Sequence, residues 1–424
     1  MNGPSAPPAS ATNLYINCAA LLASLVTFWW LLRHGAALTP QAGIFLLGAS
    51  YALPIIALEA LWRKPLPQVG RGDARAAVAV PRVLVKLLGL GVTALLVVAV
   101  YRLFPEYRGA FYNRYYQALL DAAPWGAGMA IPYFFWMDRR SGGEQDGYWH
   151  LGQAALLQWR RVDHCSVGQH LLGWLVKLFF LPLMFIYFCD KLDYYRSYDF
   201  TQVFASFRTF YDFAFQALFY IDLLIAFVGY VCTFRATDSH IRSTEPTLLG
   251  WAVALVCYQP FWSFFSAQYI HYETSFNWGG WLGHYPALYA AWGSAILLLT
   301  GVYVWATLSF GIRFSNLTHR GILTNGAYRF CKHPAYVSKN LSWWMISMPF
   351  MVSGSIGESL RHCALLLLLN GIYLLRARTE ERHLSQDADY RAYARYIEDH
   401  GLFRELGRRL PVLRFQPGRL FNVP

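Results

Sequence analysis

The chain is a succession of long apolar stretches separated by shorter polar ones. The first apolar stretch ends in Trp29-Trp30 and Arg33-His34 rather than in a small-residue cleavage site, so we interpret it as a membrane span and not as a removed signal peptide. A helix of about 20 apolar residues crosses a bilayer. Stretches of that length lie near residues 13–33, 42–62, 83–104, 117–137, 169–189, 205–233, 247–266, 286–310, 340–357 and 361–376. The pattern predicts an all-α, polytopic membrane bundle of about ten transmembrane helices.

Composition agrees with a membrane protein. Of the 424 residues, 56% are hydrophobic, 17% are aromatic and only 14% are charged, and the mean hydropathy is +0.29. So few charges do not solvate a globule of this size. The net charge of +12 is explained by membrane topology and by contact with anionic lipid, so we expect a membrane and a hydrophobic small molecule as partners and no nucleic acid.

The basic residues predict an orientation. They gather after the second, fourth, sixth and eighth apolar stretches, in residues 63–82, 139–161, 235–242 and 313–339. Loops rich in Lys and Arg face the cytoplasm. We therefore expect an integral, multi-pass protein with these loops inside, its N-terminus outside and its C-terminus cytoplasmic.

The most chemically diverse stretch is residues 321–336, GILTNGAYRFCKHPAY. Asn325-Gly326 after Thr324 is a strong turn signal, because both residues tolerate positive φ. Irregular backbone persists near a bilayer only where it is buried in protein or lines a wet cavity. Since this stretch lies between two predicted spans, the sequence predicts a binding cavity there.

A second polar group begins where the last predicted span ends. The sequence RARTEERHL, residues 376–384, contains Arg376, Arg378, Glu380 and Glu381. On a helix, Arg376 and Glu380 are four residues apart, and one interpretation is a solvated surface pair. The alternative is that one carboxylate serves the predicted cavity. The register does not decide between Glu380 and Glu381.

These two motifs, in this order and spacing, resemble the C-terminal core of the integral membrane methyltransferases. That superfamily includes the isoprenylcysteine carboxyl methyltransferases and the phospholipid N-methyltransferases. The resemblance covers about the last 110 residues, Phe310 to about Phe415. It implies S-adenosyl-L-methionine as cofactor and a lipophilic acceptor, such as an isoprenoid or a phospholipid, that enters from the bilayer. Methyl transfer from a sulfonium mainly needs in-line proximity and a dry cavity.

The resemblance also implies roles for particular residues. Lys332 replaces the usual arginine of the family's turn and so lacks its bidentate fork. Arg376 and Glu381 are the expected catalytic pair, with Glu380 or Glu381 accepting hydrogen bonds from the cofactor. The residues expected to bind the cofactor are Tyr328, Lys332, His333, Pro334, Tyr336, Glu380 and Glu381. A simpler interpretation makes Lys332 and His333 interfacial anchors.

Two other classes of function compete with methyl transfer. Sterol C14- and Δ7-type reductases have a comparable length, about ten spans and a similar histidine turn, and they use NADPH. Their tails typically carry Arg-Asp-Glu and Lys-Tyr-Gly, whereas this chain has Arg-Thr-Glu-Glu at 378–381, and this difference favours the methyltransferase. A non-catalytic membrane protein that keeps the fold would bind neither cofactor.

We divide the chain functionally near residue 280. Residues 1–280 are expected to form N-terminal membrane scaffold helices, and residues 281–424 a methyltransferase-like C-terminal core with a cytoplasmic tail. The seven cysteines show no CxxC or other regular spacing, so no metal site is expected. Asp222 lies inside a predicted span, where ionisable groups are candidates for function. Pairing with Lys177 is the structural alternative.

Overall fold

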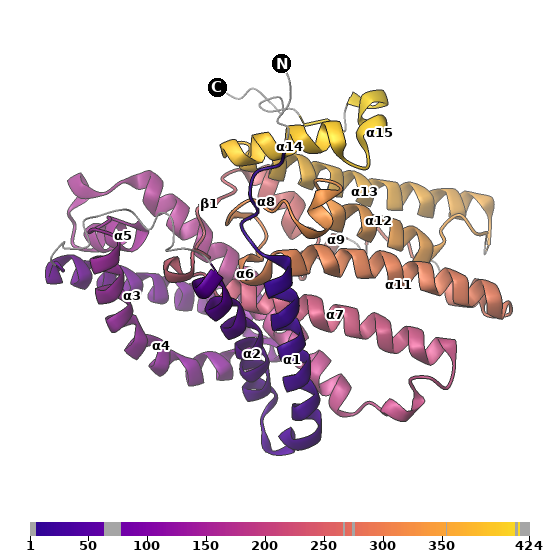
Figure 1. Cartoon of the computed structure of the whole chain (residues 1–424), viewed down its shortest axis with the longest axis horizontal. Coiled ribbons are helices and arrows are strands. Elements are labelled where there is room, and N and C mark those ends of the chain that lie inside the picture. The colour runs from indigo at the N-terminus through magenta and orange to yellow at the C-terminus, as the bar shows by residue number, and fades with distance from the viewer. Residues whose placement is uncertain are drawn as a thin grey trace. The chain divides into compact units, whose positions relative to one another are not determined.

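The computed structural model describes residues 6–62, 78–265, 268–273, 276–352, 354–411 and 414–415. The described chain is almost entirely helical, which confirms the predicted all-α class (Figure 1). Its two strands, β1 and β2, have two residues each, Ser243–Thr244 and Thr318–His319. The helices are α1 Leu14–His34, α2 Pro40–Trp62, α3 Val80–Leu103, α4 Asn113–Arg140, α5 Gly147–Ala155, α6 His164–Arg196, α7 Phe207–Val231, α8 Leu248–Leu255, α9 Phe261–Phe265, α10 Trp278–Leu282, α11 Pro286–Ser309, α12 Pro334–Ser347, α13 Ile356–Leu384, α14 Ala388–His400 and α15 Arg404–Arg409.

Seven of the described helices are long and apolar enough to cross a membrane: α1, α2, α3, α6, α7, α11 and α13. A multi-pass membrane protein is therefore supported, but the predicted count of ten spans is not confirmed. The stretch 117–137 lies in α4, which has 28 residues but is less apolar because it is interrupted by groups such as Asp121. The stretch 247–266 is broken into α8 and α9, with 8 and 5 residues.

The stretch 340–357 also departs from the prediction. Helix α12 has 14 residues and rises about 21 Å, less than the roughly 30 Å of a hydrocarbon core. It ends where Met348 adopts a left-handed conformation, with φ of 44°. The next helix starts only at Ile356, after an N-terminal capping box made by Ser355 and Glu358. The hydropathy pattern therefore predicted one continuous helix where the chain makes a turn.

The chain forms two compact units that are not contiguous in sequence. One comprises Met1–Cys18, Tyr194–Ile225 and Thr247–Pro424, and the other comprises Ala19–Asp193 and Ala226–Pro246. The functional boundary near residue 280 stays a prediction. The first unit contains both segments that carried the predicted chemistry, so it is the unit that positions the site.

The second unit is held together by close helix packing and by buried charge. An added Cβ at Gly89 of α3 would lie 1.9 Å from the backbone oxygen of Tyr148 in α5, so the two helices meet at a distance that only glycine permits. Lys86 Nζ lies 3.4 Å from Asp146, which caps the N-terminus of α5. These contacts fix α5 against α3.

In the first unit, an N-terminal segment, residues 8–12, is bonded to the loop after α11. The backbone N–H of Ala11 donates to the carbonyl of Ile322 at 2.8 Å, and Asn325 Nδ2 donates to the carbonyl of Thr12 at 2.7 Å. Ile322 also packs against Tyr390 and other residues of α14. Residues 8–12 and α14 therefore lie at the same end of α11. The predicted orientation, with the N-terminus outside and the C-terminus in the cytoplasm, stays a prediction.

Candidate functional site: a cavity around Glu381

The loop between α11 and α12 makes the predicted turn. Gly326 has φ of +57°, and a Cβ added there would lie 2.2 Å from Ser309 Oγ at the end of α11. A side chain at this position would suffer both backbone strain and a clash. Asn325 keeps φ at −105°, so only the glycine uses the left-handed conformation. The turn leads the chain directly to residues 330–333 at the start of α12.

Pro334 starts α12, and His333 is the residue immediately before it. Proline suits the first position of a helix because its φ is already helical and no N–H is needed there. Pro334 is buried and does not line the cavity. Its role is to direct the preceding Lys332 and His333 toward α13.

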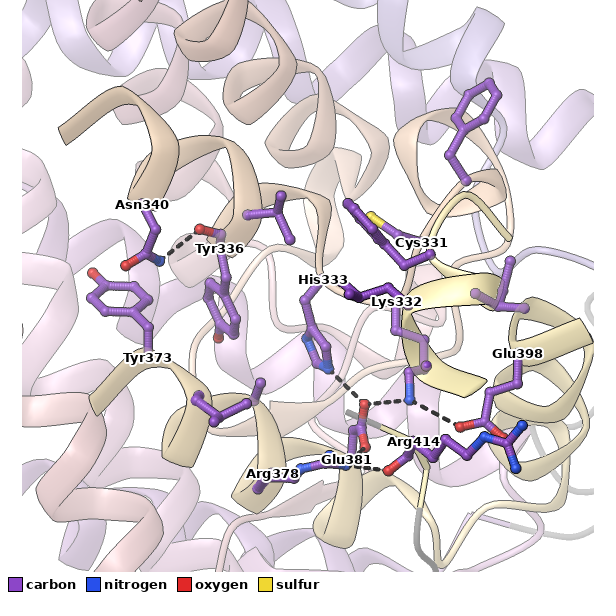
Figure 2. Close-up of a pocket in the computed structure, with 18 of the residues that line it drawn as sticks. Cys331, Lys332, His333, Tyr336, Asn340, Tyr373, Arg378, Glu381, Glu398 and Arg414 are labelled. Atoms are coloured by element: carbon purple, nitrogen blue, oxygen red, sulfur yellow. Dashed lines mark hydrogen bonds and ion pairs between the residues drawn. The ribbon is translucent and has the colours of Figure 1, made fainter. Parts of the chain in front are cut away.

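Glu381 of α13 is the centre of the site. Its side chain is buried, with the whole residue 5% exposed. Lys332 Nζ lies 2.8 Å and His333 Nε2 lies 3.0 Å from its Oε1 atom, and Arg378 donates to its Oε2 atom at 3.0 Å (Figure 2). A buried carboxylate is stable only with such compensation. The register that the sequence left open is therefore resolved, because Glu381 rather than Glu380 faces Lys332 and His333.

The chain downstream of α13 closes the cluster. Lys332 Nζ is also 3.6 Å from Glu398 of α14. Arg378 donates a second hydrogen bond, at 2.6 Å, to the carbonyl of Arg414. The start of α12, the end of α13, α14 and residue 414 are thus joined by one network of charges, which Figure 2 shows around Glu381.

Glu380 and Arg376 lie on another face of α13. Glu380 accepts a hydrogen bond from the Tyr336 hydroxyl at 2.7 Å. Arg376 is 7% exposed and donates to Asn316 Oδ1 at 2.5 Å. Its guanidinium lies 5.2 Å from the ring centroid of Tyr336 and 5.7 Å from that of Tyr373. Arg376 and Glu380 therefore form no surface pair.

The cluster borders a cavity of about 380 Å³, within the usual size range of small-molecule sites. In Figure 2 the charged side chains occupy one part of the site, and Tyr336, Tyr373 and Asn340 occupy another. The residues that line the cavity are Phe330, Cys331, Lys332, His333, Tyr336, Val337, Asn340, Asn370, Tyr373, Leu374, Ala377, Arg378, Glu381, Ile397, Glu398, Phe403, Arg404, Leu406, Gly407 and Arg414.

Four of the residues predicted to act at the site line this cavity, and four do not. Those that line it are Lys332, His333, Tyr336 and Glu381. Tyr328, Pro334, Arg376 and Glu380 are absent from its wall. Glu380 reaches the cavity wall through Tyr336, and Arg376 through the rings of Tyr336 and Tyr373. The predicted catalytic pair of Arg376 and Glu381 is thus divided between two faces.

Tyr328 packs against two tyrosines of α14, Tyr390 and Tyr393. The Tyr393 hydroxyl donates to the carbonyl of Tyr328 at 2.8 Å, and Tyr390 and Tyr393 are buried against Ile322. Burial raises the pKa of the Tyr328 and Tyr393 phenols well above the ordinary value. These rings hold α14 on the loop, and it is Ile397 and Glu398 of that helix that reach the cavity.

Cys331 lines the cavity but is a poor nucleophile. Burial raises the pKa of its thiol to about 11, so the thiol is protonated at neutral pH. Only the thiolate attacks electrophiles or binds metals well. Among the described residues, no group of three or more His, Cys, Asp or Glu side chains is arranged to hold a metal ion.

Sequence reasoning missed a pair of amides in the cavity wall. Asn370 Nδ2 donates to Asn340 Oδ1 at 2.5 Å, and Trp344 Nε1 donates to Asn370 Oδ1 at 2.8 Å. Asn370 stands in an otherwise apolar stretch, and that isolation was the available signal for it. Glu398, Arg404 and Arg414 gave none, because they belong to a tail rich in charge.

Asp222 has a structural partner. Its Oδ2 atom accepts a hydrogen bond from the Tyr303 hydroxyl of α11 at 2.7 Å. Lys177, its suggested partner, lies 3.5 Å from the ring centroid of Trp174 and donates to Thr233. The contact with Tyr303 explains how an aspartate is tolerated within α7.

The fold and cavity define a class: a multi-pass α-helical membrane protein with a half-open cavity of small-molecule size formed around α12, α13 and the segments after them. Comparisons with models of protein families, with curated proteins and with solved structures found no match.

Proposed function

We propose that this chain is an integral membrane methyltransferase that uses S-adenosyl-L-methionine and acts on a lipophilic acceptor such as an isoprenoid or a phospholipid. The observation that carries the proposal is the cavity around Glu381. Positively and negatively charged side chains line one part of this cavity, and aromatic rings and amides line another.

The chemistry of the lining fits the cofactor. S-adenosyl-L-methionine combines a base, a ribose, a sulfonium, an amino group and a carboxylate, and it supplies an activated methyl group. Arg404 and Arg414 are suited to the carboxylate, and Glu381 and Glu398 to the amino group or the ribose. The ring of Tyr336 is suited to the sulfonium. All five side chains line the same cavity.

The protein's own part in the reaction would be to position and to exclude water. His333 stacks on Tyr336, with ring centroids 5.4 Å apart and planes 3° from parallel, and Glu380 holds the Tyr336 hydroxyl. The ring is thus fixed from two sides before any ligand binds. Preorganisation of this kind lowers the cost of binding, and methyl transfer requires no general base at this position.

A lipophilic acceptor is supported by the apolar part of the wall. Phe330, Val337, Leu374, Phe403 and Leu406 line the cavity. Leu374 belongs to α13, one of the seven candidate spans, and the next residue of that helix, Leu375, is 41% exposed without lining the cavity. A hydrophobic molecule dissolved in the bilayer would therefore meet the cavity wall directly.

An NADPH-dependent reductase is the second candidate, and one observation favours it. Four cations, Lys332, Arg378, Arg404 and Arg414, line the cavity against the two carboxylates Glu381 and Glu398, and this excess of positive charge favours phosphate groups. Against it, a dinucleotide with its additional phosphate is much larger than S-adenosyl-L-methionine, and the cavity holds about 380 Å³.

The test is ligand-induced stabilisation of the purified protein in detergent. S-adenosylhomocysteine is expected to raise the melting temperature of the wild type, whereas NADPH is not. His333→Ala should abolish the effect. The matched control is Glu380→Gln, which should retain it because Glu380 lies outside the cavity and glutamine still accepts a hydrogen bond from Tyr336. Stabilisation by NADPH alone would support the reductase, and stabilisation by neither ligand would support a non-catalytic protein.

Activity provides the second arm of the test. Protein incubated with S-adenosyl-L-methionine labelled in the methyl group, together with a total membrane lipid extract, should transfer label to an organic-soluble product. The label should be absent with His333→Ala and present with Glu380→Gln. Binding of S-adenosylhomocysteine without any labelled lipid would keep the cofactor assignment and refute a lipid acceptor.

We also propose that the cavity opens toward the cytoplasm, where the cofactor is made. The basic residues of the loop between α11 and α12 support this orientation through the positive-inside rule. Since residues 8–12 are bonded to the same loop, the N-terminus would be cytoplasmic too. Reporter fusions at both termini should therefore both give the cytoplasmic signal, and opposite signals would refute the shared side.

A further inference from the structure

The segment after α14, residues 402–410, combines exposed leucines with arginines; we refer to it as the basic segment. Leu402, Leu406 and Leu410 are spaced four residues apart, and 72%, 43% and 46% of their respective surfaces are exposed. The side chains of Arg404 and Arg408 are 53% and 56% exposed, and both contact Glu405, at 3.3 and 2.7 Å. Arg409 is exposed as well. With Glu405 as its one acid, the segment carries a net charge of +2, from three arginines minus one glutamate.

The basic segment adjoins the lipid-facing side of a membrane span. Phe403, Arg404 and Leu406 share the cavity wall with Leu374 of α13. On the surface of α13, Leu374 and its neighbour Leu375 are exposed by 38% and 41%. Helix α13 is a candidate span, and Leu375 is exposed without lining the cavity.

The helix inside the basic segment is too short to be stable by itself. Helix α15 has six residues, and isolated helices shorter than about 12 residues are marginal in water. Its one leucine, Leu406, and the flanking Leu402 and Leu410 remain exposed. A short segment with exposed leucines and several arginines gains most by lying in the headgroup region of a bilayer, with its leucines among the acyl chains.

We propose that the basic segment docks on anionic phospholipid of the membrane that the chain crosses. Arg408 and Arg409 bind lipid phosphates, and Leu402, Leu406 and Leu410 enter the acyl boundary. Because Leu406 and Arg404 also line the cavity, the docked leaflet forms part of the cavity rim. The inference goes beyond the proposed methyl transfer and does not depend on which ligand the cavity takes.

The experiment compares amide hydrogen exchange of the full chain in two kinds of nanodisc, one of phosphatidylcholine alone and one that also contains phosphatidylglycerol. Peptides covering residues 402–410 should exchange more slowly in the anionic discs, and high salt should remove the difference. One arginine beside an anionic surface changes docking about fivefold, so Arg408→Gln with Arg409→Gln should weaken it about 30-fold. Arg404 is left intact because it lines the cavity.

The matched control removes two exposed arginines outside the basic segment, Arg361→Gln and Arg395→Gln, and should keep the difference between the discs. Equal exchange of residues 402–410 in both discs would overturn the proposal. So would protection that requires added S-adenosylhomocysteine, which would make the segment a cover for the cavity ligand. Protection that grows with the number of copies per disc would assign the face to a second copy of the chain instead.

Discussion

Replacing Glu381 by glutamine is the sharpest perturbation of the site. It removes the carboxylate that Lys332, His333 and Arg378 share. Removing one member of a buried ion pair costs about 3–5 kcal/mol, because the remaining charge is left uncompensated. We expect the lower end, about 3 kcal/mol, since Glu398 remains 3.6 Å from Lys332 and glutamine still accepts one hydrogen bond.

This free energy converts to a measurable shift in melting temperature. At about 2.1 cal/mol/K per residue, the unfolding entropy of 424 residues is about 0.9 kcal/mol/K. A loss of about 3 kcal/mol therefore lowers the melting temperature by about 3 °C, read from tryptophan fluorescence during heating in detergent. Glu380→Gln is the matched control, one position away on another face, and should shift it by less than about 1 °C because its hydrogen bond survives.

A second substitution separates charge from packing. Adding Lys332→Gln to Glu381→Gln removes one of the uncompensated cations, so the double variant should melt higher than Glu381→Gln alone. The carboxylate is not the centre of a buried ion cluster if Glu381→Gln has the melting temperature of the wild type. The same conclusion follows if the double variant has a lower melting temperature than Glu381→Gln alone.

Three further predictions follow from single contacts. Gly326→Ala should lose about 1–3 kcal/mol of stability through strain at positive φ and the clash with Ser309. Gly301→Ala, where the added Cβ meets nothing, should lose less stability, and equal losses in the two variants would contradict strain at Gly326. Tyr393→Phe should cost about 1 kcal/mol, because the carbonyls of the site loop lose their donor, and an unchanged melting temperature would refute it. With its pKa near 11, Cys331 is only about 0.1% thiolate at pH 8, so iodoacetamide should label it far more slowly than the exposed Cys165. The labelling rate of Cys331 should rise about tenfold per pH unit up to about pH 11, and a rate that does not change with pH would contradict the raised pKa.

The sequence predicted the elements whose signals are local. The turn at Gly326 follows from the dihedral freedom of glycine, and the start of α12 follows from Pro334. The apolar stretches identified the all-α class because helices must satisfy their own backbone in lipid. Where the prediction of spans failed, as at 340–357, the apolar pattern continued across a left-handed turn at Met348 that hydropathy does not register.

The register of the site was beyond the sequence because it depends on packing. Glu380 and Glu381 are adjacent and chemically identical, and only the placement of α12 against α13 decides which meets His333. The orientation of the two termini stays a prediction. An even number of spans places both ends on one side, so the predicted count of ten does not agree with an external N-terminus and a cytoplasmic C-terminus.

The bonds between residues 8–12 and the loop after α11 have a consequence for biogenesis. Partners such as Thr12 and Ser309, or Pro8 and Thr324, are 297 and 316 residues apart. At a translation rate of about 5–20 residues per second, the earlier partner waits roughly 15–60 s for the later one to be made. The ends must meet late in membrane insertion, so a fragment of residues 281–424 produced alone should emerge with that loop unpaired and vulnerable to quality-control proteases.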